Sequence, residues 1–248
     1  MKRNRKKHSC FFLLTIVLFA ALVCVALLIG KKKIKINDSF VSTDEIIGVD
    51  ISHYQGDVDM DKLIGQGVKF VYAKATEGSG SVDECFEKNR ENGLKSGMTM
   101  GFYHFFSFDS PGKDQAENFI KTVGAEPGLL IPVVDVEFYG NKEKNPPEKE
   151  DVERELSGLL RELEREYGCK PMIYTTLKVY HKYIKGTYDD YPLWIRNVYF
   201  PANYVVGDAW TMWQYDDTAL LDGIKGDEKY IDMDVIHKEK GWGALLMK

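Results

Sequence analysis

The run Leu130-Ile131-Pro132-Val133-Val134-Asp135-Val136-Glu137-Phe138 sets two carboxylates, one residue apart, into an otherwise apolar stretch. Such a run predicts a buried strand, because parallel sheets are covered on both faces and their strands are apolar along their length. Successive strand side chains alternate between faces, so Asp135 and Glu137 share one face, with about 6.5 to 7 Å between their Cα atoms. Ligands in such folds bind at the carboxyl ends of strands. The pair is therefore a candidate catalytic site, with a metal site or a solvated strand end as alternatives.

Seven further runs are rich in β-branched and aromatic residues and are bounded by turn residues. They are Ile46–Ser52, Val68–Thr76, Thr99–Phe106, Lys170–Thr176, Leu193–Tyr199, Trp210–Tyr215 and Tyr230–Ile236. Helical periodicity predicts helices over Val82–Lys95, Asp109–Val123 and Glu148–Tyr167. Strands that alternate with helices are typical of a β/α barrel. We therefore predict an α/β fold, an irregular TIM-like barrel of about eight strands with fewer helices in its second half.

The N-terminal segment predicts a membrane anchor. Residues 1–10 are basic, and residues 11–30 form an uninterrupted apolar run. About 20 apolar residues match the hydrocarbon thickness of a bilayer. The run is longer than a usual signal-peptide core, and no small-x-small cleavage site precedes the following lysines, so we predict an uncleaved transmembrane signal anchor behind a cytoplasmic tail. Residues 31–44 would form a stalk and residues 45–248 the barrel. A cleaved leader and a secreted domain are the alternative.

The charge is unevenly distributed along the chain. The whole chain carries −5, from 33 basic and 38 acidic residues, and nine of the basic residues lie before Ile36 with no acid among them. The remainder has 24 basic and 38 acidic residues, which gives −14. Polyanions repel a domain of this charge, so we expect no nucleic-acid partner.

The cysteines do not predict a disulfide framework or a zinc site. Cys10 and Cys24 belong to the apolar run, while Cys85 and Cys169 are far apart and lack the spacing of zinc ligands. We expect two thiols, with one disulfide as the alternative. We also expect no metal and no cofactor, although a hard cation on the strand-end carboxylates is a chemical alternative.

The predicted strands end in acids and aromatic rings, which would surround one mouth of a barrel. The strand-end residues are Asp50, Glu77, Tyr103 or His104, Asp135 with Glu137, Tyr174, Trp194 with Arg196, Trp213 with Tyr215, and Asp232 with Asp234. Sugar rings pack their C–H faces on aromatic rings, while acids act on the glycosidic oxygen. The composition of the mouth therefore predicts a carbohydrate site.

Seven blocks of the chain, in order, resemble glycoside hydrolase family 25, the N-acetylmuramidase lysozymes. They are Gly48–Gly56 (GVDISHYQG), Tyr72–Glu77 (YAKATE), Gly101–Phe105 (GFYHF), Pro132–Glu137 (PVVDVE), Leu193–Ile195 (LWI), Trp213–Tyr215 (WQY) and Ile231–Asp232 (ID). The resemblance implies an irregular β/α barrel that hydrolyses the β-1,4 bond between N-acetylmuramic acid and N-acetylglucosamine in peptidoglycan. Together with the anchor, it predicts a single-pass membrane protein with its catalytic domain outside the cytoplasm, and we expect a monomer.

The resemblance also implies roles for individual residues. Glu137 corresponds to the general acid, and Asp135 to the group that stabilises positive charge on an oxocarbenium-like centre or an oxazolinium ion. Asp50 and Asp232 correspond to acids that position the substrate and tune charge. Residues 195–199 (IRNVY) stand where small residues are commoner, which predicts a bulkier or more polar subsite wall. Substrate contacts are expected from Glu77, Tyr103, His104, Tyr174, Trp194, Trp213 and Tyr215, each of which is otherwise a core or solvated residue.

Two other functions stay open at this point. A chitinase-like or N-acetylglucosaminidase-type hydrolase also ends its active-site strand in DxE, but it predicts an Asp-Gly-x-Asp-x-Asp-x-Glu run, whereas Leu130–Val134 precedes Asp135 here. A non-catalytic barrel that binds the cell wall is the other alternative. The presence of all four acids argues against it.

Overall fold

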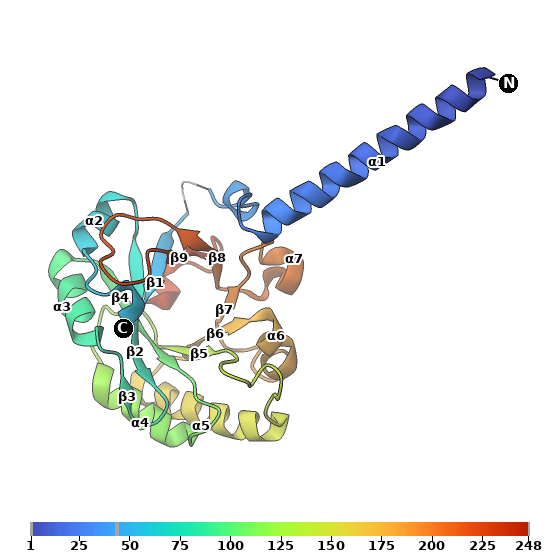
Figure 1. Ribbon diagram of the computed structural model, residues 1–248. Helices are drawn as coiled ribbons and strands as arrows, with labels where there is room; N and C mark the ends of the chain where they lie inside the picture. Colours follow the sequence, from blue (N-terminus) through green and yellow to red (C-terminus); the bar gives the residue numbers. More distant parts are fainter. Residues whose placement is uncertain (1, 43–44, 248) are drawn as a thin grey trace.

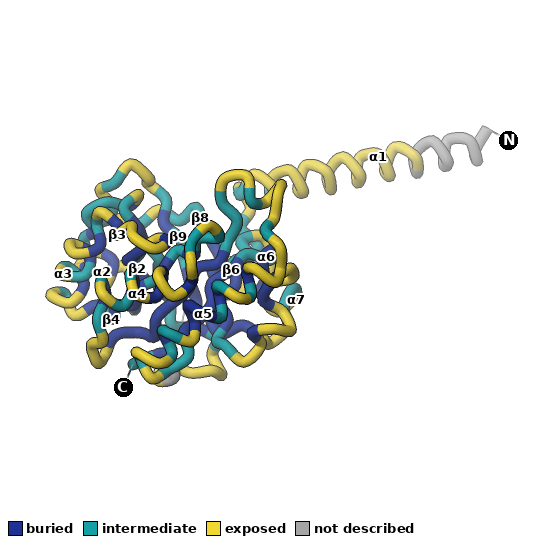
Figure 2. The backbone as a smooth tube through the Cα atoms, turned by 90° about the horizontal axis from the view of Figure 1, so that it is seen from below, coloured by how far each residue is buried: buried dark blue, intermediate teal, exposed yellow. Residues whose placement is uncertain are grey.

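An apolar helix precedes an α/β barrel in the computed structural model, which describes residues 2–42 and 45–247 (Figure 1). The helix, α1 (Lys2–Gly30), projects away from the barrel. Its Phe12–Gly30 portion is long and apolar enough to cross a membrane, and none of it is buried inside the molecule (Figure 2). By length and composition, such a helix fits a signal anchor or a signal peptide.

Eight strands close into the barrel, which confirms the predicted fold class. In ring order they are β1 (Ile47–Ile51), β2 (Phe70–Glu77), β4 (Thr99–Phe105), β5 (Val133–Val136), β6 (Met172–Thr176), β7 (Leu193–Arg196), β8 (Met212–Ala219) and β9 (Ile231–Ile236). Pairing of β1 with both β2 and β9 closes the ring. Strands β1, β2 and β4 to β8 run parallel around it, whereas β9 is antiparallel to β1 and β8. The two-residue β3 (Ser81–Val82) pairs with β2 outside the ring.

The helical cover is thicker on the first part of the barrel, as predicted. Its helices are α2 (Met60–Gly65), α3 (Phe86–Ser96), α4 (Gly112–Val123) and α5 (Lys149–Tyr167). Later elements are shorter: α6 (Leu177–Val179), η3 (Tyr180–Ile184), α7 (Asn203–Val206) and η4 (Gly207–Ala209). The predicted helix from Val82 begins only at Phe86, because Ser81–Val82 pairs with β2. The helices α2, α6 and α7 were not predicted, since one or two turns carry little periodicity.

The barrel has separate inner and outer cores. Apolar side chains of the helices, such as the leucines of α5, pack on the outward faces of the strands. Large rings fill the inside: the centroids of Tyr72 and Trp194 lie 5.3 Å apart. Glycines make room for these rings, because a Cβ at Gly101 would lie 2.2 Å from Tyr72 and one at Gly48 would lie 2.3 Å from Phe70. The interior is thus a packed core below the mouth.

The C-terminal segment closes the end of the barrel where the parallel strands begin. Leu245 of η5 (Trp242–Leu245) is buried, and its carbonyl accepts a 2.8 Å hydrogen bond from the Ile131 amide. The Leu130 amide donates to the Met100 carbonyl, and Pro132 has no N–H. The strand predicted over the run Leu130–Phe138, which is β5, therefore begins at Val133 rather than at Leu130. The opposite end, where β1, β2 and β4 to β8 finish, is left for a cleft.

Residues 31–42 lie along the barrel beside the ends of β7 and β8. Lys32 and Lys35 donate hydrogen bonds of 2.5 Å to Asp217 and Asp216, respectively. The buried Asn37, in the short η1 (Asn37–Ser39), donates two hydrogen bonds of 2.9 Å to backbone carbonyls on the barrel. This segment, which the sequence predicts as a stalk, is therefore fixed to the barrel surface.

Candidate active site

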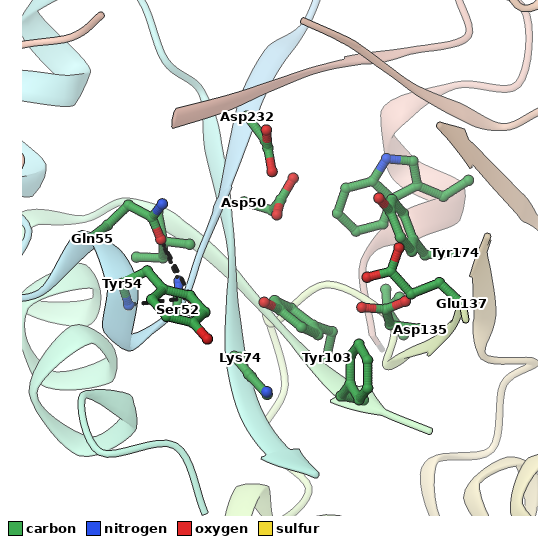
Figure 3. Close-up of a pocket in the computed structure, with 14 residues that line it drawn as sticks. Asp50, Ser52, Tyr54, Gln55, Lys74, Tyr103, Asp135, Glu137, Tyr174 and Asp232 are labelled. Carbon is green, nitrogen blue, oxygen red and sulfur yellow. Dashed lines mark hydrogen bonds between the residues drawn. The ribbon is translucent and has the colours of Figure 1, made fainter. Parts of the chain in front are cut away.

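A cleft of about 220 Å³ opens at the carboxyl ends of the parallel strands (Figure 3). Alternation along each strand decides which side chains face it, because every second residue points into the barrel. Its lining residues are Asp50, Ile51, Ser52, Tyr54, Gln55, Lys74, Tyr103, Phe105, Val133, Asp135, Glu137, Tyr174, Trp194 and Asp232. All four carboxylates that the sequence predicts as catalytic thus line one cleft.

Strand β5 delivers Asp135 and Glu137 to the same face, as the spacing predicts. Asp135 is 7% exposed and lies at the base of the pair, while Glu137, one residue past the end of the strand, is partly exposed. Oδ1 of Asp135 is buried and has no hydrogen-bond partner among the described residues. Two carboxyls at different depths therefore meet at one wall of the cleft.

Asp50 and Asp232 lie across the cleft from this pair (Figure 3). They are register partners on β1 and β9. The sequence places Asp232 among the strand-end residues, but β9 runs antiparallel, so Asp232 lies near the start of its strand. It reaches the same mouth because the start of an antiparallel strand lies beside the ends of its parallel neighbours.

The crowding of acids raises their pKa values. Burial raises the pKa of Asp50 to about 6 and that of Asp232 to about 8, the latter with help from the charge of Asp50. Burial, followed by the charges of Glu137 and Asp50, raises the pKa of Asp135 well above its usual range. Burial also raises the pKa of Glu137, against the charges of Arg196 and Lys74. Carboxyls this close titrate as a set, and they lose their protons at higher pH than isolated carboxyls do.

A second layer below the cleft holds Asp50 in place. Gln214 donates a 2.7 Å hydrogen bond to Asp50 and accepts a 3.0 Å hydrogen bond from the Tyr174 hydroxyl. Asp234 is fully buried, and its Oδ1 accepts a 2.9 Å hydrogen bond from the Trp194 indole. Asp234 is expected at the mouth of the barrel from its strand-end position but does not line the cleft, and no role is predicted for Gln214. Side chains two residues apart on a strand face the same side, so Asp234 faces the same side as Asp232 and Gln214 the same side as the inward Met212. This alternation predicts that both lie inside the barrel.

Three of the aromatic residues expected to contact substrate line the cleft. They are Tyr103, Tyr174 and Trp194. Lys74 lies in the same wall, with its Nζ 4.9 Å from the centroid of the Phe105 ring. The wall thus offers aromatic faces and one cation to a polar ligand.

His104 does not reach the cleft, because it points to the opposite face of β4 from Tyr103. It is fully buried, and its ring nitrogens lie 2.7 Å from the Thr76 hydroxyl and 3.0 Å from Gln115 Oε1. Burial lowers its pKa to about 4, so the ring is neutral. His104 joins β4 to its neighbour β2 and to helix α4, and we do not retain it as a substrate contact.

Trp213, Tyr215 and Glu77 also lie outside the cleft lining. Trp213 and Tyr215 flank Gln214 on β8, so they face the outer core, and the Trp213 indole donates a 2.9 Å hydrogen bond to the Asn197 carbonyl. Glu77 lies at the rim and accepts a 2.6 Å hydrogen bond from Lys74. Its hydrogen bond holds the side chain of Lys74, which does line the cleft.

The loop after β1 adds a further aromatic side chain, Tyr54, to the edge of the cleft, and no role is predicted for it from the sequence. A capping box between Ser52 and Gln55 shapes the turn η2 (His53–Gln55), and the buried Asp83 binds the His53 backbone amide and ring. Tyr54 projects from this turn and is 61% exposed at the cleft edge. An exposed aromatic on a rigid turn is suited to stacking against a sugar ring.

No group of three or more His, Cys, Asp or Glu within residues 2–42 and 45–247 is arranged to hold a metal ion. Cys24, Cys85 and Cys169 are free thiols. The groups that line the cleft and can act on a ligand are carboxyls with raised pKa values, one lysine and aromatic rings.

Comparison with known proteins points to one family. A family model described as glycosyl hydrolases family 25 matches residues 49–224. The uncharacterized protein YegX of Escherichia coli K12 is 32% identical over 186 residues, and the match covers 73% of this chain and 66% of that protein. Lysozyme M1 of Streptomyces globisporus is 26% identical over 208 residues, covering 75% of this chain and 66% of that protein. The match thus spans about two thirds of the length of each of these relatives. A solved family 25 glycosyl hydrolase from Bacillus anthracis is 48% identical, with a TM-score of 0.73, over 79% of this chain and 91% of its own.

Proposed function

Because this chain belongs to glycosyl hydrolase family 25, we propose that it is a lysozyme of the N-acetylmuramidase type. Its substrate would be the glycan of peptidoglycan, cut at the β-1,4 bond between N-acetylmuramic acid and N-acetylglucosamine. The observation that carries this proposal is the meeting of Asp135, Glu137, Asp50 and Asp232 in one cleft with aromatic walls. Paired carboxylates with raised pKa values are the machinery of glycoside hydrolysis.

Glu137 is proposed as the general acid. It is the partly exposed member of the β5 pair, so its carboxyl is placed to meet a glycosidic oxygen in the cleft. Burial raises its pKa, which keeps a proton available nearer to neutral pH. The acid gives this proton to the leaving oxygen as the bond from that oxygen to the anomeric carbon breaks. Water then bonds to the anomeric carbon and returns a proton to the carboxylate.

Asp135 is proposed to stabilise the positive charge that develops as the bond breaks. The charge lies on an oxocarbenium-like centre or on an oxazolinium ion formed by the 2-acetamido group of the substrate, and an ionised Asp135 would serve either route. Because burial raises the pKa of Asp135 well above its usual range, this role requires the proton of the pair to sit on Glu137 in the bound complex. Asp50 and Asp232 would position the sugar and tune the pair.

We also propose that α1 is an uncleaved single-pass anchor that holds the barrel outside the cytoplasm, next to its polymer. Its length, its apolar composition and the basic residues on both sides support this proposal. A secreted enzyme would instead lack α1 after processing. The mass of the mature protein isolated from cells separates the two forms, since an anchored chain keeps residues 11–30.

Digestion of purified peptidoglycan tests the activity. The full chain in detergent is incubated with the polymer, and the products are reduced and analysed by mass spectrometry, with Glu137→Gln as the control. New reducing ends on muramic acid are expected from the wild type only. Ends on N-acetylglucosamine would instead indicate the glucosaminidase-type alternative. Binding to the polymer without any new ends would indicate a non-catalytic wall-binding barrel.

A further inference from the structure

The end of α1 is held against one side of the barrel by residues 31–42. The ion pairs of Lys32 and Lys35 and the two hydrogen bonds of Asn37 join this segment to the β7 and β8 side. Ile29, in the last turn of α1, shares a narrow crevice with Val198 of the loop that follows β7. The surface of the barrel next to α1 is therefore fixed relative to the end of the helix.

That surface carries four large aromatic side chains that the protein leaves uncovered. Tyr204 is 70% exposed, Phe40 and Phe200 are each 50% exposed, and Tyr199 is 39% exposed. Phe40 directly follows η1, Tyr199 and Phe200 lie in the loop after β7, and Tyr204 lies in α7. The two segments meet through an edge-to-face contact, with 6.0 Å between the ring centroids of Phe40 and Tyr204. We refer to these four residues as the aromatic collar.

Basic residues lie beside the aromatic collar. Lys31 and Lys33 are exposed, and Nζ of Lys32 lies 5.9 Å from the centroid of the Tyr199 ring. The contacts of Lys32 with Tyr199 and of Phe40 with Tyr204 place the loop after β7 and helix α7 beside residues 31–42, which follow α1. Exposed rings and lysines therefore gather at the level where the apolar part of α1 ends at Gly30.

We propose that the aromatic collar is a membrane-contact surface that seats in the headgroup layer of the bilayer crossed by α1. The inference rests on the proposed anchoring. Aromatic side chains are enriched at membrane interfaces, where their apolar faces meet acyl chains and their polar atoms meet water. Lysines next to them attract anionic headgroups. The headgroup layer begins where the apolar helix ends, so the collar and the lysines lie at the depth that this layer occupies.

The position of the collar favours lipid over a protein partner. It adjoins α1 itself, and a protein would have to enter between the barrel and the membrane to reach it. The remaining exposed apolar residues of the barrel, such as Leu94 on α3, are spread over other elements. Figure 1 shows α3 on the side of the barrel away from α1, so Leu94 is a matched exposed control.

Photocrosslinking tests the proposal with the full chain. p-Benzoylphenylalanine replaces Phe200 or Tyr204 in the test variants, Leu94 in the negative control and Phe19 of α1 in the anchoring control. Each variant is reconstituted into vesicles of phosphatidylglycerol and phosphatidylethanolamine that contain a radiolabelled lipid, and is irradiated. Lytic activity on peptidoglycan fragments is measured for each variant to show that the barrel is folded.

We expect lipid adducts at positions 19, 200 and 204, with yields at 200 and 204 several-fold above that at 94. Adducts at 19 alone would overturn the collar proposal while leaving the anchor intact. No adduct at 19 would overturn the proposed anchoring and, with it, the basis of the collar. Equal yields at 94 and 204 would also overturn the proposal, as would crosslinks at 200 and 204 to a second copy of the chain instead of lipid.

Discussion

The side-chain amide of Gln214 donates a 2.7 Å hydrogen bond to Oδ2 of Asp50. The carbonyl oxygen of the same amide accepts a hydrogen bond from the hydroxyl of Tyr174, which fixes which end of the amide faces Asp50. Asp50 is thereby held from below by Gln214. We expect this support to matter more for turnover than for folding.

Gln214→Leu tests the support of Asp50. The variant removes both hydrogen bonds at similar volume, and we expect kcat to fall by about 10- to 100-fold, because hydrogen bonds to charged groups contribute roughly 1.5–3 kcal/mol. KM should change less, since Gln214 does not line the cleft. Steady-state kinetics on peptidoglycan fragments measure both constants. Gln66→Leu, far from the cleft, is the control, and an unchanged kcat in Gln214→Leu would contradict the assigned role.

The proposed division of roles between Glu137 and Asp135 predicts different responses to the leaving group. Glu137→Gln should reduce hydrolysis of natural glycan by about 10²- to 10⁴-fold, because general acid catalysis contributes that much. An aryl glycoside leaves without protonation, so this variant should regain much of its rate on it. Asp135→Asn should stay impaired on both substrates, since both develop positive charge at the anomeric carbon. Rescue of Asp135→Asn, rather than Glu137→Gln, would reverse the two roles.

The raised pKa of Asp232 predicts that folding stability falls with rising pH. Its folded-state pKa is about 8, against an ordinary value of 3.8, so between these values the folded state binds more protons than the unfolded state. The free energy of unfolding therefore decreases across this window and is lowest above pH 8. Asp232→Asn should raise it at pH 8 by about 1–3 kcal/mol and leave it nearly unchanged at pH 4.

Urea denaturation at the two pH values measures this effect. Asp227→Asn, at an exposed position, is the control and should show no such pH dependence. A loss of stability in Asp232→Asn at pH 8 would mean that the carboxylate is held by stabilising contacts. The expected gain in stability, coupled to a loss of activity, would mark Asp232 as a residue kept for catalysis at the expense of folding.

Gly101 is predicted to tolerate no side chain. A Cβ there would lie 2.2 Å from the Tyr72 ring, which is packed against Trp194 in the barrel interior. Gly101→Ala should therefore lower the free energy of unfolding by about 1–3 kcal/mol, the usual cost of overpacking. Gly65→Ala is the matched control, because no atom lies within 4 Å of the added Cβ in helix α2. Thermal or chemical denaturation of both variants measures the difference.

Asn37 is predicted to hold the segment before the barrel in place. Its side chain is 1% exposed and donates to the carbonyls of Asn197 and Tyr215. Asn37→Ala leaves both carbonyls without this donor, so the local cost should be about 1–3 kcal/mol. Hydrogen exchange of residues 31–42 should then become faster, while Asn145→Ala, at an exposed loop position, should not change it. Unchanged exchange in Asn37→Ala would contradict the role.

The sequence predicts the strands and the shared face of Asp135 and Glu137 because both depend on period-two patterns, whereas the roles proposed for the acids come from the family resemblance. Alternation on β5 places Asp135 and Glu137 correctly on one face, and the apolar runs locate the eight strands of the ring. The same rule, applied strictly, separates Tyr103 from His104 and selects Gln214 over Trp213 on β8. Adjacent residues on a strand face opposite sides of the sheet, so Tyr103 and His104 cannot both line the cleft. The prediction of both as substrate contacts missed this alternation.

Other features depend on partners distant in sequence, which a local pattern does not contain. The antiparallel direction of β9 follows from its pairing with β1 and β8. The late start of β5 follows from the hydrogen bonds of Leu130 and Ile131 to Met100 and to the C-terminal segment. The docking of Asn37 depends on carbonyls about 160 to 180 residues away.

With α1 as the proposed anchor, the docked segment before the barrel would limit how far the enzyme can act from the membrane. Residues 31–42, as a free flexible chain, would let the cleft search a distance of roughly 20 Å. Because they are fixed to the barrel, they would hold the cleft of an anchored enzyme at a distance from the membrane that is set by the size of the barrel itself. Glycan passing at that height would meet the cleft at a high effective concentration, and glycan beyond it would not be cut. The anchor would then determine which layer of the cell wall the cleft reaches, and cleavage would be confined to the layer nearest the membrane.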